Sequence, residues 1–555
     1  MIRKNLRWMV ALLLTANLAV TTPNTVRAGN RSDDAPTATP IKHVVVIFQE
    51  NISFDHYFGT YPHAQNNAGE TPFHAKEGTP RVNNLETAGL LTQNNNADSK
   101  GNQVNPFRIP PSVPVTCDND HNYNDEQFAF HGGLMDQWLT TLPEGGTVTC
   151  ADPVLGPYTA MGYYDGNTVA AMWHYAQHFA MSDNSFGTTF GPSTPGALNL
   201  IAGTIFGGTL FPLKANGKPA SPAGDLAGGS ANSAVTTGAV IGDARPHLDD
   251  CVQTTPGLAG AVQVTVSGRN IGDLLNAKNL TWGWFQGGFA PTGTVNGLAV
   301  CGQHHVGLAG DDALTQSSDG DYIPHHQPFQ YFASTTNQHH TRPSDARLIG
   351  TSADGANHQY DIIDFTTALN EGRLPAVSFL KAPAYQDGHP GYSDPIDEQF
   401  FVVNIINSLM QSRFWKDTAI IIAYDDSDGW YDHQMGPIVN QSNEPIDDQL
   451  LGSGNCGTPR TQPQTNSVQN GRCGYGPRLP LLVISPFSKT NFVDHRVTDQ
   501  SSIIRFVEDN WGLGRIGGGS ADAIAGSLEG MFDFDGHASR LILDPATGQV
   551  LRDSD

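Results

Sequence analysis

The sequence is short of basic residues: 30 lysines and arginines stand against 54 acidic residues in 555, for a formal net charge of −24. An electrostatic field of that sign repels nucleic acids and anionic lipid surfaces, so we expect no nucleic-acid partner. An anionic substrate would have to be held locally, by a metal ion or by directed hydrogen-bond donors. The excess of carboxylates can supply the ligands of such a metal ion.

Long apolar runs are also missing beyond the first thirty residues, so no integral membrane segment of about 20 residues is expected there. The N-terminus combines a basic start with an apolar run over residues 8–20 and small residues at 26 and 28. This pattern predicts a signal peptide over residues 1–28, and hence a secreted or periplasmic protein, rather than a buried N-terminal helix. Residues 29–40 are interpreted as a disordered leader.

Cysteine is scarce, and none of the six cysteines has the spacing of a zinc site. Their number is even and the expected compartment is oxidising, which favours disulfides. Pairing of sequence neighbours would close surface loops, although the sequence leaves the connectivity open. These neighbours are Cys117 and Cys150, Cys251 and Cys301, and Cys456 and Cys473.

The distribution of apolar residues predicts an α/β fold. Nearly continuous apolar runs, typical of strands buried on both faces of a parallel sheet, occur at residues 43–48, 418–424 and 479–485. Helical spacing of apolar residues occurs at residues 168–181, 400–409 and 503–511. Strands that alternate with helices indicate a layered fold with a central, mainly parallel sheet flanked by helices.

No internal repeat or clear linker divides the chain, so we interpret residues 41–511 as one large domain. A stretch rich in glycine, alanine, serine and proline, at about residues 207–245, is interpreted as an inserted loop region. Residues 512–555 are interpreted as a C-terminal tail.

Two of the predicted strands are followed by acidic or amide residues. The first leads into Glu50-Asn51 and the second into Asp425-Asp426. Ligands of open parallel sheets bind at the carboxyl ends of the strands, so these oxygens would meet if the strands are neighbours. Carboxylates that lie so close together repel each other unless a cation lies among them. The pattern therefore predicts a divalent ion, either calcium, magnesium, manganese or zinc; turn and cap residues are the alternative.

A candidate nucleophile lies in the segment Thr189-Phe190-Gly191-Pro192-Ser193-Thr194-Pro195-Gly196. Proline is favoured in the first turn of a helix, so a helix over residues 195–202 with Thr194 as its cap is expected. Ser193 would then lie at the positive end of that helix, where a phosphate group is favoured. The hydroxyl becomes a useful nucleophile when a metal ion or a base activates it. A plain helix start is the alternative interpretation.

Histidines next to acids, glycine or proline are the remaining candidates for phosphate chemistry, because they can donate hydrogen bonds to phosphate oxygens and protonate a leaving group. Any one of them alone is more typical of a surface or structural role. The candidates are His121, His325, His326, His389 and His433.

The string from Lys42 to Gly59, which contains Glu50-Asn51-Ile52-Ser53-Phe54-Asp55, closely resembles the opening motif of the bacterial phosphoesterase family. That family includes secreted acid phosphatases and phosphatidylcholine-hydrolysing phospholipases C, with a fold related to that of alkaline phosphatase. Further segments that resemble the family follow in order at residues 133–136, 189–195, 325–329, 425–433, 476–478 and 498–511.

The resemblance implies a role for each candidate. The metal ligands would be Glu50, Asn51, Asp425 and Asp426, with Ser193 as both nucleophile and fifth ligand. The histidines that face the phosphate would be His121, His389 and either or both of His325 and His326. Ser193 would attack phosphorus, and water would then hydrolyse the phosphoserine.

The sequence departs from the family pattern after the nucleophile turn, where Pro195-Gly196-Ala197 replaces the usual Pro-Asn-Arg. It also lacks the twin arginines and the long C-terminal extension of the larger phospholipases C. The last two of these features and the acidic charge favour an acid phosphatase acting on phosphomonoesters, whereas the missing asparagine and arginine bear on how the substrate is positioned. A phospholipase C acting on phosphatidylcholine, an inactive phosphate-ester binding protein and a sulfatase-like esterase are the alternatives. The oligomeric state has no signal in the sequence.

Overall fold

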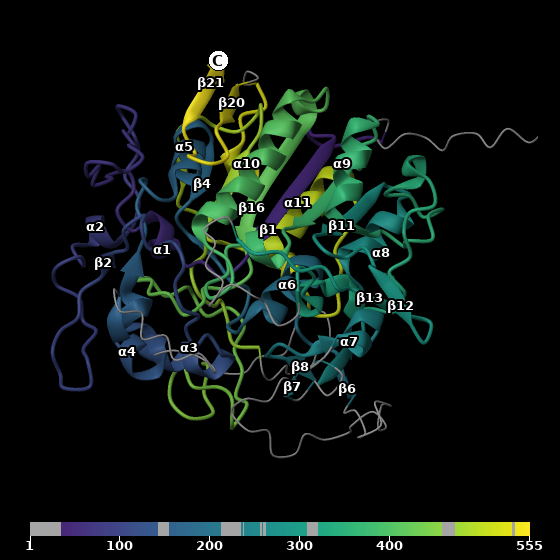
Figure 1. Cartoon of the computed structure of the whole chain (residues 1–555). Helices are drawn as coiled ribbons and strands as arrows, with labels where there is room; N and C mark the ends of the chain where they lie inside the picture. The colour runs from purple at the N-terminus through teal and green to yellow at the C-terminus, as the bar shows by residue number, and fades with distance from the viewer. Residues whose placement is uncertain are drawn as a thin grey trace, which may run out of the picture.

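An eight-stranded sheet runs through the middle of the molecule, with helices on both of its faces (Figure 1). The computed structural model describes residues 35–142, 155–211, 235–236, 238–255, 258, 262–307, 320–457, 472–535 and 539–554. In spatial order the strands of the sheet are β14 (Gln359–Asp361), β11 (Trp282–Gln286), β15 (Val377–Lys381), β1 (His43–Gln49), β16 (Thr418–Tyr424), β17 (Leu481–Ile484), β4 (Ala180–Ser182) and β18 (Phe492–Asp494).

Helices and small sheets complete the described part of the chain. The α-helices are α1 (Phe54–Phe58), α2 (Leu85–Ala88), α3 (Tyr123–Phe130), α4 (Trp138–Thr141), α5 (Ala170–His178), α6 (Ser193–Ala202), α7 (Asp250–Thr254), α8 (Ile271–Ala277), α9 (Ile362–Asn370), α10 (Pro395–Gln411) and α11 (Ser501–Trp511). The small sheets are β6 (Gly208–Phe211) with β10 (Gln263–Val266) and β9 (Arg245–Pro246), β12 (Gly293–Val295) with β13 (Leu298–Val300), β19 (Thr498–Asp499) with β5 (Ser185–Phe186), β2 (Phe107–Arg108) with β3 (Gly162–Tyr163), β20 (Arg540–Leu543) with β21 (Val550–Ser554), and β7 (Val235–Thr236) with β8 (Ala239–Val240).

The predicted α/β fold with a mainly parallel sheet is confirmed. Within the central sheet, β17 alone runs antiparallel to its neighbours β16 and β4. β1 lies between β15 and β16 and is parallel to both, so the two most apolar predicted strands are neighbours. Alternate side chains of β1 enter two different cores: Val44 and Val46 face α6, α8 and α11, whereas Val45 and Ile47 face α5, α9 and α10. Burial on both faces explains why these strands are apolar throughout.

The predicted helices are present with shifted ends. Residues 400–409 belong to α10 and residues 503–511 belong to α11. The helix expected over residues 168–181 is wrong at its C-terminal end, because α5 stops at His178 and residues 180–182 form β4. Helical and strand periodicity overlap in this short apolar run, and pairing with β17 and β18 selects the strand.

Both ends of the described chain pack on the fold. Thr39, in the second half of the expected disordered leader, donates its hydroxyl to Asn510 Oδ1 of α11 at 2.7 Å, so this half is ordered. In the expected tail, Leu541 and Leu543 of the β20–β21 hairpin are buried against α10, at the top of Figure 1. The expected signal peptide and most of the 207–245 insertion lie outside the described residues.

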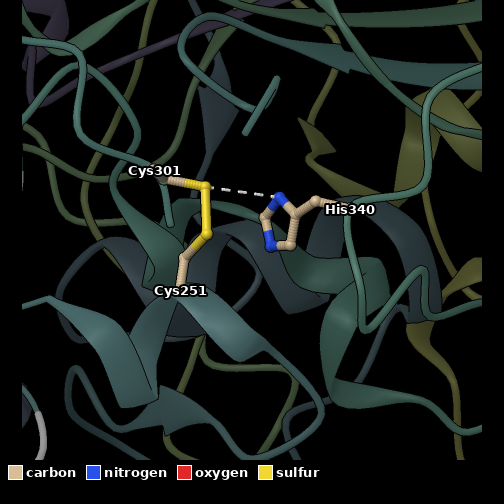
Figure 2. A group of neighbouring side chains, drawn as sticks. All are labelled: Cys251, Cys301 and His340. Atoms are coloured by element: carbon tan, nitrogen blue, oxygen red, sulfur yellow. Dashed lines mark hydrogen bonds between the residues drawn. A yellow bond between two sulfur atoms is a disulfide. The ribbon is translucent and has the colours of Figure 1, made fainter. Parts of the chain in front are cut away.

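Two of the expected disulfides are present, Cys251–Cys301 and Cys456–Cys473. Cys150 lies outside the described residues, so its pairing with Cys117 stays a prediction. Figure 2 shows His340 beside the first disulfide, with Nδ1 3.4 Å from Cys301 Sγ. Because both sulfurs are oxidised, this trio is a packed structural contact and not a thiolate metal site. In the described part of the chain, no helix is both long and apolar enough to cross a membrane.

Candidate active site

The parallel pairing of β1 and β16 brings their carboxyl ends together. Gln49 pairs with Tyr424, so Glu50 and Asp425 leave the sheet side by side. The backbone N–H of Asn51 donates to Asp425 Oδ1 at 3.0 Å. Asn51 adopts φ 57°, a left-handed conformation that asparagine tolerates better than most residues. The turn therefore directs oxygens from both strand ends into one buried region.

The start of α6 brings Ser193 to the same place. Its Oγ donates to Glu50 Oε2 at 3.0 Å and to Asp426 Oδ2 at 3.2 Å, and the residue is only 1% exposed. The helix begins at Ser193 itself, after Pro192, so the predicted start near Pro195 with Thr194 as cap is wrong. The backbone N–H of Thr194 is inside the first turn and donates to Asp243 Oδ1 at 3.0 Å.

Gly196 explains how α6 approaches the strand end so closely. A Cβ atom at this position would lie 2.2 Å from the backbone oxygen of Asp425, a distance that no side chain can adopt. The departure from the family's Pro-Asn-Arg pattern is therefore coupled to close packing of α6 against the segment that follows β16. A larger residue at this position requires α6 or the Asp425 backbone to shift.

Burial and mutual repulsion set the charges of this cluster. Burial raises the pKa of Asp425, and the neighbouring Glu50 adds to the effect, so the pKa lies well above its usual range. The pKa of Asp426 is raised in the same way by burial and by Asp425. Burial also opposes ionisation of Glu50, but His326 and Lys381 more than offset it and hold its pKa well below the ordinary value. A cation among these carboxylates would relieve the repulsion.

The residues present fit a divalent metal ion. Asn51 is fully buried, yet its Oδ1 has no hydrogen-bond partner, an arrangement that costs free energy unless a ligand uses the oxygen. With the oxygens of Ser193, Glu50, Asp425 and Asp426, it would complete an all-oxygen donor set. Such a set suits magnesium, calcium or manganese, and zinc also accepts carboxylate oxygens.

Two predicted histidines flank the cluster. His121 Nε2 lies 3.4 Å from the amide nitrogen of Asn51, and its Nδ1 contacts the carbonyl of Asn119 at 2.7 Å. Burial lowers the pKa of His121, but Asp426 and the other nearby carboxylates more than offset this, so its pKa is raised well above the usual value. The ring of His389 lies 6.2 Å from that of His121 and contacts the carbonyl of Pro390 through Nδ1 at 2.6 Å.

The two members of the histidine pair at 325–326 face different partners. His326 Nδ1 lies 3.0 Å from Glu50 Oε1 and is 3.9 Å from Asp387 Oδ2. His325 instead directs Nε2 toward Asp243 Oδ2 at 3.9 Å. Asp243 also accepts a hydrogen bond from the first turn of α6, so both histidines of the pair border the Ser193 region. Of the two, only His326 contacts a predicted metal ligand, Glu50.

Three further charged residues enter the site and were missed by the sequence reasoning. Lys381, the last residue of β15, pairs with Glu50 Oε1. Asp428 accepts the Asn51 side-chain amide at 3.2 Å, and the carbonyl of Asp387 accepts the Glu50 backbone N–H at 3.0 Å. A signal existed for Lys381, since it follows a buried apolar run in the same way as Glu50 and Asp425 follow theirs.

Glu126 of α3 joins the two loops that carry the nucleophile and the acidic pair. Its carboxylate accepts the backbone N–H of Gly191 at 3.0 Å and the hydroxyl of Ser427 at 2.7 Å. Burial raises its pKa to about 7, although both hydrogen bonds act in the opposite direction. No local pattern in the sequence indicates this role, because it depends on two loops that meet only in the fold.

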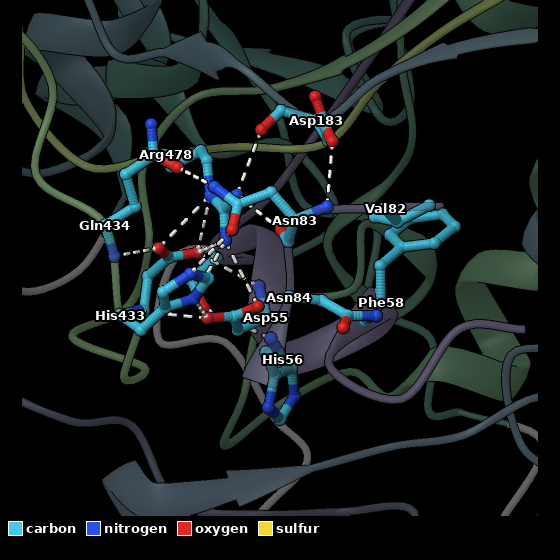
Figure 3. Close-up of polar contacts among 12 residues, drawn as sticks. Asp55, His56, Phe58, Val82, Asn83, Asn84, Asp183, His433, Gln434 and Arg478 are labelled. Atoms are coloured by element: carbon cyan, nitrogen blue, oxygen red, sulfur yellow. Dashed lines mark hydrogen bonds and ion pairs between the residues drawn. The ribbon is translucent and has the colours of Figure 1, made fainter. Parts of the chain in front are cut away.

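A second buried network joins the loops after β1 and β16 (Figure 3). Arg478, which is fully buried, contacts Asp55 at 3.1 Å and Asp432 at 3.1 Å, and it also donates to the carbonyl of Asp183. His433 Nδ1 lies 2.5 Å from Asp55 Oδ2. Since the Arg478 guanidinium and the His433 ring already pair with the two carboxylates, this group is an ion-pair network that holds the loops after β1 and β16 together.

His433→Asn is expected to lower stability in a pH-dependent way. Burial lowers the pKa of His433, but the Asp55 carboxylate outweighs this and raises the pKa above its usual value. The stabilisation by the charged ring is therefore full below about pH 6.5 and is lost as pH rises through the raised pKa of the folded state. Asparagine keeps a neutral hydrogen bond, so we expect a loss of about 2 kcal/mol at acidic pH that shrinks at alkaline pH.

Urea unfolding of wild type and variant at a series of pH values measures this difference. His63→Asn is the matched control, because His63 also pairs with a carboxylate, that of Glu86, but its side chain is 69% exposed. A stability difference that stays constant or grows with pH would contradict the assignment.

A model of the Phosphoesterase family matches residues 41–514 of the chain. The non-hemolytic phospholipase C of Pseudomonas aeruginosa is 25% identical over 511 residues, which cover 91% of this chain and 57% of that protein. Phospholipase C A of Mycobacterium tuberculosis is 25% identical over 496 residues, with 86% and 74% covered. The chain thus spans a little over half the length of the Pseudomonas relative.

A solved structure from Vibrio parahaemolyticus, described as a protein in the alkaline phosphatase superfamily, aligns with 68% of this chain and 67% of its own. The sequence identity is 12% and the TM-score is 0.27.

Proposed function

The chain belongs to the Phosphoesterase family, and we propose that it is a secreted or periplasmic, metal-dependent phosphoric ester hydrolase that acts through a phosphoserine at Ser193. The proposal rests on one observation above all. The Ser193 hydroxyl lies within 3.2 Å of Glu50 and Asp426, at the edge where the ends of β1 and β16 meet.

A divalent ion would be held by Glu50, Asn51, Asp425 and Asp426 together with Ser193 Oγ. When bound, it would lower the pKa of the hydroxyl and neutralise charge on the phosphate. The orphaned Asn51 Oδ1 and the raised pKa values of the two aspartates support this assignment.

The reaction has two steps. In the first, a bond forms between Ser193 Oγ and phosphorus while the bond from phosphorus to the leaving alcohol breaks. The Ser193 proton passes to Asp426, because its pKa is raised whereas that of Glu50, the other carboxylate in contact, is lowered. His121 donates a proton to the leaving oxygen, and His389 lies where it can donate to the phosphate oxygens; His326, whose pKa burial lowers to about 4, orients Glu50 through Nδ1. In the second step, water hydrolyses the phosphoserine.

Small phosphomonoesters are the proposed substrates. Ser193 is 1% exposed and Asp425 is 3% exposed, so the reacting phosphate must approach buried side chains. A small ester can do so more easily than a lipid that stays anchored in a bilayer. The acidic net charge of −24 also disfavours anionic membranes. A phospholipase C activity on phosphatidylcholine is the second candidate, because the two relatives above carry that name.

A substrate panel separates the two activities. We expect an aryl phosphomonoester to be hydrolysed with a kcat/KM at least about 10²-fold above that for an aryl diester or for phosphatidylcholine vesicles. The same panel with Ser193→Ala corrects for contaminating enzymes. Faster release of phosphocholine from vesicles than of phosphate from the monoester would overturn the monoesterase assignment in favour of a phospholipase C.

A further inference from the structure

Lys381 is buried in the middle of the acidic cluster. It ends β15, the strand beside β1, and is 1% exposed. Its ammonium pairs with Glu50 Oε1, and its Nζ lies 5.6 Å from the centre of the Phe48 ring. An ammonium group so far from solvent is retained only where it compensates nearby negative charge.

The groups around Lys381 form a set of metal-ligand type. Glu50, His326 and Asp387 each offer one ligand atom, and these atoms lie within 4.8 Å of one another. All three residues are buried, with exposures of 0%, 3% and 0%. Two carboxylates and one imidazole are a donor set that holds zinc and similar ions in other proteins.

Glu50 divides its two oxygens between two sides of the cluster. Its Oε2 accepts the Ser193 hydroxyl, on the side of the proposed catalytic metal. Its Oε1 faces His326 at 3.0 Å and the Lys381 ammonium. A glutamate with its oxygens divided in this way could bridge two cations, one at each oxygen. The position at Oε1 is already occupied by a cation of the protein, the Lys381 ammonium.

We propose that the Lys381 ammonium takes the place of a second divalent ion beside Glu50, so that Glu50, His326 and Asp387 hold a protein cation where they could hold a metal. This inference rests on the proposed function, because Glu50 must be a ligand of the first ion. Lys381 then determines how many ions the site binds. The fixed positive charge repels a further cation, and it does so without any entropy cost for recruiting an ion from solution.

The test is to count bound ions in the full-length protein. Wild type, Lys381→Ala and Lys381→Arg are dialysed to equilibrium against Mn²⁺, and in parallel against Zn²⁺, and the metal content per chain is measured by mass spectrometry. Lys381→Ala is expected to bind one ion more per chain than wild type, because it removes the charge and leaves room. Lys381→Arg keeps the charge and is expected to match wild type.

Lys381→Gln guards against failure of the alanine variant to fold. Its neutral amide has a similar length and offers an oxygen ligand, so it should also gain one ion. Adding Asp387→Asn to either variant should abolish the gain, because it removes one of the three ligands.

Equal ion numbers in wild type, Lys381→Ala and Lys381→Gln would overturn the inference while leaving the proposed function intact. A purely structural role for Lys381 also predicts equal or lower ion numbers in the neutral variants. If wild type takes up no ion at all, the metal-dependent function itself fails, and the inference fails with it.

Discussion

Ser193→Ala is expected to reduce the hydrolysis of every phosphate ester by roughly 10³-fold or more. The variant loses the single atom that forms the bond to phosphorus, and no neighbouring hydroxyl contacts both Glu50 and Asp426 among the residues that the structure describes. The smaller side chain fits the same buried space, so folding should be unaffected. Initial rates with an aryl phosphate and the thermal unfolding temperature measure the two effects.

The matched control for this prediction is Ser378→Ala. Ser378 lies in β15, is fully buried, and its Oγ has no hydrogen-bond partner, so its removal deletes a buried hydroxyl without touching the site. Rapid acid quenching of the wild type should trap phosphate on the peptide that contains Ser193, and none should appear in Ser193→Ala. Retention of most of the activity, or phosphate on another residue, would refute the assignment.

The convergence of Glu50 and Asp425 could be predicted from the sequence because parallel strands place their carboxyl ends at one edge. The apolar runs before these residues identify the strands, and burial on both faces makes the runs unusually clear. What the runs do not encode is strand order. That β1 lies between β15 and β16 depends on packing against helices from distant parts of the chain, so the apolar run before Lys381 could mark it as a strand end but not place it beside Glu50.

The start of α6 shows where local signals fail. Pro195 suggests a helix that begins two residues too late, since proline is tolerated throughout the first turn and not only at its first position. The true start at Ser193 is supported by Asp243, which lies 49 residues further along the chain and accepts a hydrogen bond from the backbone N–H of Thr194. Glu126 is a similar case, because its two partners, Gly191 and Ser427, come from loops that only the tertiary fold brings together.

Removal of the metal ion is expected to lower activity by about 10²-fold or more, with recovery on addition of a divalent ion. Without a cation, burial and mutual repulsion raise the pKa values of Asp425 and Asp426. Protons therefore compete with the metal ion for these two carboxylates. Metal affinity should therefore increase with pH. Dialysis against a chelator, followed by titration with single ions, measures both effects, and activity that is indifferent to exhaustive chelation would remove the metal from the mechanism.

The same pKa shifts fix how stability depends on pH in the metal-free protein. A carboxyl whose folded-state pKa is raised stabilises the fold fully below its unfolded value of about 3.9, and this contribution is lost as pH rises through the raised pKa. The metal-free protein should thus become less stable with increasing pH, whereas the metal-bound protein should not. Asp426→Asn removes one of these charges and should flatten the trend, while Asp509→Asn, an exposed site on α11, should leave it unchanged. The contrary result is a metal-free protein whose stability rises from pH 5 to pH 8 in parallel with that of the metal-bound form. The negative charges of the two aspartates would then already be balanced by groups of the protein, and the cluster would need no ion.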